Sequence, residues 1–291
     1  MALLLFSCAK KSEIKFDPDA KFQPRFWFVK GDHFETYHYQ SNTIIHPVTG
    51  IRDLRRSYGI RYEVLEARVD SGAMLKMHFH EILAVALERN NRVGSGKVIR
   101  GKGIVEWEGD PGMTKEQLTA LTEGYTYLRV STEGRVLAVG TTPPPSNPLS
   151  VTDWSKVEGY GPPPFEQVTV HQNLFGVIFP GTQIERYQRW EKKIGLPIRF
   201  GEARALFNVR FLLADVHGAN LHITGRGTPQ PEAEGAKLQI TDGSYMSQSM
   251  YDLSRQFIKS HREEGELTYK LPDGKTVRER FEMRVRTSKV K

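Results

Sequence analysis

The sequence predicts an α+β fold, built mainly from antiparallel β-strands with three or four helices. Three observations lead to this prediction: segments in which apolar and polar residues alternate, helix-start signals followed by apolar residues at helical spacing, and a turn signal between two C-terminal strands. With 291 residues and 38% hydrophobic side chains, the chain is long and apolar enough to bury a substantial core.

Alternation predicts strands in the first half and in the last third of the chain. Ile60, Tyr62 and Val64 alternate with charged neighbours, and the apolar odd positions of residues 205–213 alternate with Arg204, Asn208 and Arg210. Near the C-terminus, residues 272–275 read Pro-Asp-Gly-Lys between two further alternating segments. An Asp-Gly pair at this position predicts a β-hairpin.

Helix signals occur in three segments. A capping box at Thr114–Gln117 begins one predicted helix, and a second capping box at Thr182–Glu185 begins another, which runs to Gly195. From about residue 247 to 264, apolar residues recur with the 3.6-residue spacing of an amphipathic helix. These segments supply the helices of the predicted α+β fold.

Residues 73–90 fit either a helix or a strand. Their many Ala, Leu, Met and Glu residues favour a helix, which Asp70 and Ser71 would cap and Asn90 would end. Apolar residues at alternate positions fit a strand instead. We expect the helix, and the strand remains the alternative.

Two proline clusters, at residues 141–148 and 159–164, bracket the middle of the chain. Proline lacks an N–H and fixes φ, so neither cluster belongs inside a helix or a central strand. We therefore predict an N-terminal α+β region (1–140), a Pro-rich connector (141–164) and a C-terminal α+β region (165–291) that ends in a basic hairpin. The alternative is a long surface loop within one domain.

The charge and the cysteine content limit the classes of function. A net charge of +7 and an isoelectric point near 9.3 favour an anionic partner. Cys8 is the one cysteine, so an intramolecular disulfide is excluded. The residues up to Cys8 resemble a bacterial lipobox, which would imply a lipid anchor; otherwise we expect a cytoplasmic or particle-associated protein. No apolar stretch is long enough to predict a membrane-spanning helix.

A histidine pair offers the one local pattern for metal chemistry. His78 and His80 lie two residues apart beside Glu81. On a strand the two imidazoles would share a face and could bind one divalent transition metal, whereas on a helix they would lie about 200° apart. With a preceding glycine, the pair resembles the first motif of the cupin family of β-barrels. The resemblance implies a metal-dependent enzyme that uses His78, His80 and either Glu81 or a third histidine, because Ala84 and Val85 occupy the positions of the motif's glutamate.

The predicted last strand carries a cationic face. Four arginines stand at even positions while the odd positions are mostly apolar: Arg278, Arg280, Arg284 and Arg286. Guanidinium groups on alternate strand residues suit bidentate contacts with phosphate or carboxylate groups. A solvated edge protected from aggregation by charge is the structural alternative.

A second basic cluster, Arg52, Arg55 and Arg56, is interleaved with aromatic residues. That combination fits contact with a nucleic-acid backbone and stacking on its bases. We therefore expect a non-enzymatic structural or assembly protein without a cofactor, such as a virion or nucleoprotein component. Its basic faces would bind nucleic acid or an acidic subunit within an oligomer. The alternative function is the cupin-like metal enzyme.

Overall fold

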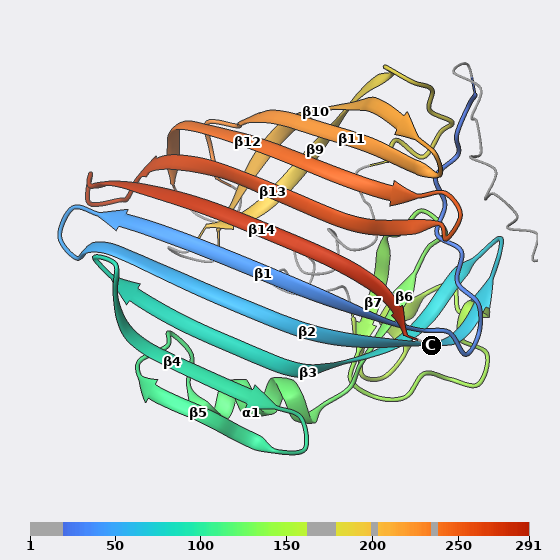
Figure 1. The fold of residues 1–291 in the computed structure, drawn as a ribbon, viewed down its shortest axis with the longest axis horizontal. Helices are drawn as coiled ribbons and strands as arrows, with labels where there is room; N and C mark the ends of the chain where they lie inside the picture. Colours follow the sequence, from blue (N-terminus) through green and yellow to red (C-terminus); the bar gives the residue numbers. More distant parts are fainter. Residues whose placement is uncertain (1–19, 162–178, 199–202, 234–237, 291) are drawn as a thin grey trace, which may run out of the picture.

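The computed structural model describes residues 20–161, 179–198, 203–233 and 238–290, so Cys8 lies outside the described residues. This part of the chain is nearly all antiparallel β-sheet, with 64% strand and 6% helical residues (Figure 1). It contains one α-helix, and the predicted α+β fold with three or four helices is therefore wrong. No helix in the described ranges has the length and apolarity to cross a membrane.

The strands belong to one large sheet. The first eight are β1 (His33–His46), β2 (Gly50–Arg68), β3 (Gly72–Glu88), β4 (Asn91–Ile99), β5 (Gly103–Gly109), β6 (Thr126–Val130), β7 (Val136–Gly140) and β8 (Tyr160–Gly161). The others are β9 (Arg189–Ile198), β10 (Ala203–His217), β11 (Asn220–Pro229), β12 (Gln239–Asp252), β13 (Phe257–Lys270) and β14 (Thr276–Val290).

Most neighbours in the sheet are also neighbours in the sequence. The strand order is β8-β7-β6-β3-β2-β1-β14-β13-β12-β11-β10-β9, and β4 and β5 branch from β3. The pairing of β1 with β14 joins the two halves of the chain in the middle of the sheet (Figure 1). Strands from 1–140 and 165–291 therefore share one sheet, and the division at 141–164 stays a prediction.

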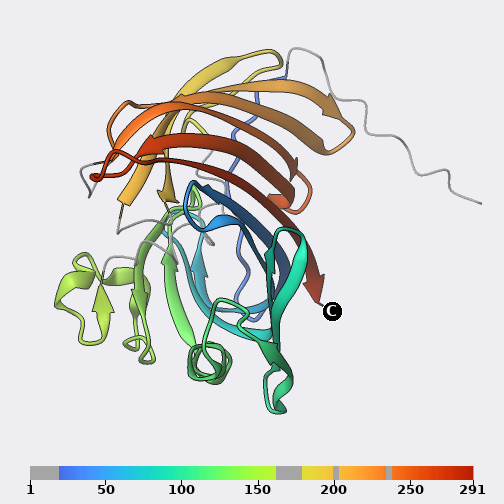
Figure 2. The same cartoon turned by 90° about the vertical axis from the view of Figure 1, so that its left-hand side faces the viewer.

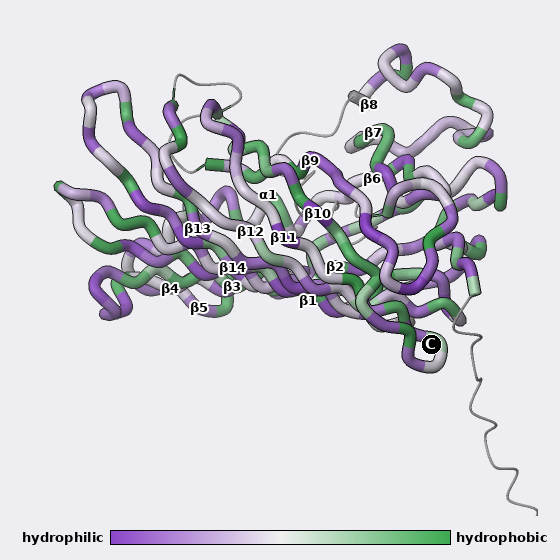
Figure 3. The backbone as a smooth tube through the Cα atoms, turned by 90° about the horizontal axis from the view of Figure 1, so that it is seen from above, coloured by the Kyte–Doolittle hydropathy of each residue, from purple (hydrophilic) through white to green (hydrophobic). Residues whose placement is uncertain are grey.

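One face of the sheet carries the main core. Along β10, Phe207 and Phe211 are fully buried while Asn208 and Arg210 are exposed, so the alternation predicted at 205–213 is confirmed. Hydrophobic and hydrophilic residues alternate similarly along other strands (Figure 3). The sheet curves strongly (Figure 2). We call the face with the main core the inner face and the opposite one the outer face.

The predicted C-terminal hairpin is confirmed. The β13 and β14 strands pair from Ser260–Arg286 to Lys270–Thr276. In the turn, the backbone N–H of Leu271 donates to the carbonyl of Lys275 at 2.8 Å, and Gly274 has a φ of +81°. A glycine suits this left-handed backbone because it has no Cβ.

The helix expected at residues 73–90 is wrong, because this segment forms β3. It pairs with β2 along one edge and with β4 and β6 along the other. Met74 and Leu75 are neighbours on opposite faces, yet both are fully buried. Burial on both sides of a central strand outweighs the modest preference of Ala, Leu and Glu for a helix.

The helix expected at residues 182–195 is also wrong. Ile184 instead forms an isolated bridge with Phe22, and Tyr187 has a left-handed φ of +67° before β9 begins. Trp190 and Ile194 both belong to β9, and the side chains of both are buried. A spacing of four residues places two side chains on one face of a strand as well as of a helix, so this pattern did not distinguish them.

The third incorrect helix, at residues 247–264, is replaced by the β12–β13 hairpin. A turn at residues 253–256 interrupts the segment, and Gln256 has a φ of +56°. Gly265, the expected helix end, lies within β13, where a Cβ would overlap the Phe281 ring. Its glycine therefore permits close packing across the sheet.

The α-helix α1 (Lys115–Glu123) confirms the first helix prediction. The Thr114 hydroxyl accepts from the Gln117 N–H at 3.2 Å, and the Gln117 side chain accepts from the Thr114 N–H at 2.9 Å. This reciprocal pair satisfies two N–H groups that a helix start leaves unpaired. Leu118 is fully buried in the main core.

Part of the predicted connector packs on the outer face of the sheet. Two short 3₁₀ helices, η1 (Pro148–Ser150) and η2 (Trp154–Lys156), precede β8. Leu149 and Trp154 form a second buried cluster with Met74 of β3, whose neighbour Leu75 belongs to the main core. This segment therefore covers the outer face at the β3–β6–β7 end, and residues 162–164 lie outside the described ranges.

Candidate ligand-binding groove

The histidine pair lies at an irregularity in β3. Phe79 is opposite Ile60 and Glu81 is opposite Gly59, so His80 is an additional residue between two regular pairs. Such a β-bulge changes the direction of nearby side chains and is often found beside functional sites. His78 is opposite Arg61 and the His80 ring lies over Gly59, so the bulge places the two imidazoles against different residues of β2.

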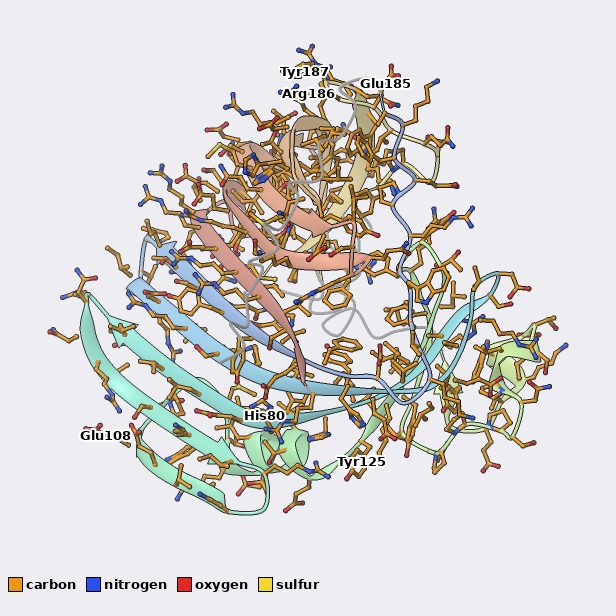
Figure 4. All side chains as sticks on the ribbon, turned by 45° about the vertical axis from the view of Figure 1, so that its right-hand side comes forward. His80, Glu108, Tyr125, Glu185, Arg186 and Tyr187 are labelled. Atoms are coloured by element: carbon orange, nitrogen blue, oxygen red, sulfur yellow. The ribbon has the colours of Figure 1, made fainter. Side chains whose placement is uncertain are left out.

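The two imidazoles have separate surroundings. His78 stacks edge-on against Tyr125, with ring centroids 5.6 Å apart, and Figure 4 shows Tyr125 and His80 in the part of the sheet beside α1. Burial, followed by the positive charges of Arg100 and Arg61, lowers the pKa of His78 to about 4. His78 is therefore a neutral imidazole at pH 7.

His80 faces β1 and β2. Its Nε2 atom lies 3.0 Å from Glu35 Oε1, and its ring stands edge-on to Tyr37. Burial lowers the pKa of His80, and the Glu35 carboxylate opposes this effect. The imidazole lies over Gly59, where a Cβ would come within 2.5 Å of it.

The third candidate metal ligand, Glu81, is held elsewhere. Its carboxylate lies 2.7 Å from the Nζ atom of Lys97 on β4. Among the described residues, no group of three or more His, Cys, Asp or Glu side chains is arranged to hold a metal ion. The cupin-like hypothesis therefore gains no third ligand there, and we base no proposal on it.

The β14 arginines differ in their partners. Arg278 and Arg280 both contact Glu266, at 2.5 and 2.8 Å, and Arg284 contacts Glu282 at 2.6 Å. Arg286 is exposed and has no ion-pair partner within the described ranges. The cationic face predicted for β14 is thus largely compensated by carboxylates, apart from its Arg286 end.

The second arginine cluster is divided between the two faces of β2. Arg55 shares the outer face with Ser57 and contacts Asp53 at 2.8 Å. Arg52 and Arg56 lie at the alternate positions, and Arg52 contacts Asp110 at 2.9 Å. The sequence cluster therefore does not form one arginine surface.

A groove of about 450 Å³ lies on the outer face where β3, β2, β1 and β14 are adjacent. The pairing registers arrange its lining in two rows across the strands. One row is Arg286, Tyr37, Gly59 and Glu81, and the second row is Arg284, Tyr39, Ser57 and Leu83. The structure thus brings Arg284, Arg286 and Glu81 from the two predicted sites into one groove.

The small residues of β2 form the floor of this groove, and larger side chains of its neighbours form the sides. Tyr37 is 52% exposed, and the Arg284 guanidinium lies 5.7 Å from the Tyr39 ring centroid. Burial, followed by the charge of Glu35, raises the pKa of Tyr37, so its hydroxyl remains a hydrogen-bond donor at pH 7. A ligand can therefore meet aromatic surface beside two guanidinium groups.

Tyr37, Tyr39 and Leu83 were missed by the sequence predictions. The sequence does contain the alternating Tyr37-His38-Tyr39 pattern, which in a strand places the two tyrosines on one face and His38 on the other. His38 is indeed buried, 3.1 Å from the Thr36 hydroxyl. Tyr37 and Tyr39 lie beside the arginines of β14 only because β1 pairs with β14, and these two strands are far apart in the sequence.

No family model and no curated protein matches the sequence at a significant level. Among solved structures, the chain is similar to lipovitellin, in work on its lipid–protein interactions, with 10% identity and a TM-score of 0.46. That match covers 90% of this chain, which spans a quarter (25%) of the lipovitellin chain. An outer membrane channel from Pseudomonas putida F1 matches with 10% identity and a TM-score of 0.27, over 94% of this chain and 98% of the channel. At these scores we draw nothing about function from either likeness.

Proposed function

We propose that this is a non-enzymatic nucleoprotein component that binds single-stranded nucleic acid through the outer-face groove. The observation that carries the proposal is the pairing of a guanidinium with a tyrosine in each row, Arg286 with Tyr37 and Arg284 with Tyr39. Proteins bind single strands by combining positive charge for the phosphates with aromatic rings for the bases.

The two ends of the groove favour one orientation of the ligand. Arg286, which has no ion-pair partner within the described ranges, makes the β14 side cationic, whereas Arg284 is paired with Glu282 and Glu81 at the β3 side is paired with Lys97. Phosphates should therefore lie along β14 while the bases extend over Tyr37 and Tyr39. The absence of a Cβ at Gly59 makes room for the His80 imidazole, which lies over this residue beside Tyr37.

The net charge of +7 supports the same class of ligand, because it favours encounter with a polyanion. The compensated arginines Arg278 and Arg280 contribute less, since each must exchange Glu266 for a phosphate. We therefore assign phosphate contact to Arg286 first and Arg284 second.

Fluorescence anisotropy with a labelled oligonucleotide of about ten nucleotides tests this function. Binding should weaken as salt is raised, with a slope of about −0.7 per phosphate contacted in a plot of log affinity against log salt. Tyr37→Ala should cost about 1–3 kcal/mol of binding energy. Arg286→Ala should weaken binding and make the salt slope shallower by about 0.7.

Trp27→Ala and Arg25→Ala are matched controls, because Trp27 is also 52% exposed and Arg25 is exposed, and neither lines the groove. Both should bind the oligonucleotide as the wild type does. No binding at low salt, or equal losses in the controls, would refute the proposal. Binding of polyglutamate in preference to the oligonucleotide would replace nucleic acid with an acidic protein partner.

A further inference from the structure

A second groove, of about 670 Å³, lies on the outer face of β9, β10 and β11. Three arginines line it, one from each strand: Arg189, Arg210 and Arg226. All three are exposed, and β13 and β12 separate these strands from β14. This basic groove is therefore separate from the tyrosine-lined groove.

The two central arginines are placed unfavourably for an unoccupied surface. Arg210 of β10 and Arg226 of β11 are directly opposite each other in the sheet. Side chains at opposed positions have Cβ atoms about 4.5–5.5 Å apart, and like charges there repel. A charged side chain can protect an open sheet edge from aggregation, but this does not explain the position of Arg226, because β11 has a strand on each side.

The carboxylates do not balance the arginines in this groove. Glu191 is the one acidic residue of its lining, and its Oε1 atom accepts from both Nε and Nη2 of Arg210 at 3.1 Å. Arg189 and Arg226 have no ion-pair partner among the described residues. The lining consequently keeps two uncompensated positive charges.

Another opposed arginine pair in the same sheet provides an internal comparison. Arg262 and Arg284 are also directly opposite, on β13 and β14. Two carboxylates balance the charges of these two arginines. Arg262 lies 2.7 Å from Glu264 and 3.1 Å from Glu282, and Glu282 also contacts Arg284. That pair is neutralised within the protein, whereas the Arg210–Arg226 pair is only half neutralised.

We propose that the basic groove binds a phosphate monoester carried by a soluble small molecule. Guanidinium groups from three strands can surround a doubly charged oxyanion and donate paired hydrogen bonds to it. Thr224 and Thr228 add hydroxyl donors on the Arg226 strand. Leu212 is the one large apolar side chain of the lining, so the groove offers little surface for an acyl chain.

Isothermal titration calorimetry of the full chain with inorganic phosphate and with glycerol 3-phosphate tests the proposal, with chloride as the control anion. Both phosphates should bind and raise Tm, and chloride should do neither. Arg226→Gln should weaken phosphate binding at least about tenfold. The same variant should have an unchanged or higher Tm without phosphate, because it removes the repulsion with Arg210.

Arg186→Gln is the matched control, since Arg186 is paired with Asp215 at 2.9 Å and does not line the groove. Arg186 is labelled in Figure 4 beside Glu185 and Tyr187. It should bind phosphate as the wild type does. Equal binding by Arg226→Gln and the wild type would overturn the site. Binding to vesicles that contain phosphatidic acid, without binding of either soluble phosphate, would overturn the soluble source. Loss of oligonucleotide binding in Arg226→Gln would overturn the assignment of the basic groove as a separate phosphate site.

Discussion

The contact of His80 with Gly59 gives a sharp test of the groove's construction. In Gly59→Ala the new Cβ would lie 2.5 Å from the Cε1 and Nε2 atoms of His80. Carbon atoms pack at about 3.5–4.0 Å, so the imidazole must retreat by about 1 Å. That movement takes Nε2 away from Glu35, which it now approaches at 3.0 Å.

The expected cost follows from two opposing effects. Overpacking of this kind costs about 1–3 kcal/mol. Replacing a strand glycine with alanine recovers about 0.5–1 kcal/mol of backbone entropy, since Gly59 has no left-handed φ. Taking the mid-range value of each effect, Gly59→Ala should lower the free energy of unfolding by about 1 kcal/mol.

Urea denaturation of a double-mutant cycle with His80→Ala measures this coupling. In the His80→Ala background the obstructing ring is absent, so Gly59→Ala should be neutral or slightly stabilising. An equal loss of stability in both backgrounds would refute the assigned contact. Gly59→Ala should also weaken oligonucleotide binding, because the displaced imidazole enters the groove.

Three further predictions concern stability. His78 is neutral in the folded protein down to about pH 4 but titrates near 6.5 when unfolded, so the unfolded state binds more protons between these values. Urea-measured stability should fall on acidification from pH 6.5 to 4, and a His78→Gln variant with the same pH slope would contradict this cause. Tyr245→Phe removes a buried 2.9 Å hydrogen bond to the Glu263 carboxylate and should lower the free energy of unfolding by about 1.5–3 kcal/mol, seen as a lower Tm. The control Tyr125→Phe changes an exposed ring and should leave the Tm nearly unchanged. Thr114→Ala should cost about 0.5–2 kcal/mol and Thr114→Ser much less, and equal losses would exclude the capping hydroxyl.

The elements predicted correctly are those in which local and long-range interactions agree. The Thr114 capping box precedes a segment that pairs with no strand, so its helix forms. Residues 205–213 are apolar at every odd position and include Asn208 and Arg210 at even positions, a pattern that a helix cannot place on one face. At residues 182–195 the local capping signal conflicts with the pairing of Trp190 with Phe211 on β10, and the sheet prevails.

The candidate site was predictable only in part. Alternating arginines on β14 correctly indicated side chains that project from one face of a strand. The tyrosines that complete the groove come from β1, near the opposite end of the described chain. Nothing local in either segment specifies that Tyr37 lies opposite Arg286, because register between distant strands is decided by the packing of the whole sheet.

The position of β1 beside β14 also has a consequence for how the protein folds during synthesis. The β14 strand pairs with β1 from His33–Val290 to Ile45–Arg278, so contacts in the middle of the sheet link residues about as far apart in the sequence as the described ranges allow. Such high contact order slows folding. Until the ribosome has released β14, the edge of β1 is unpaired and open to other chains. A chaperone that shields this edge would therefore act from the time β1 leaves the ribosome until β14 has followed it.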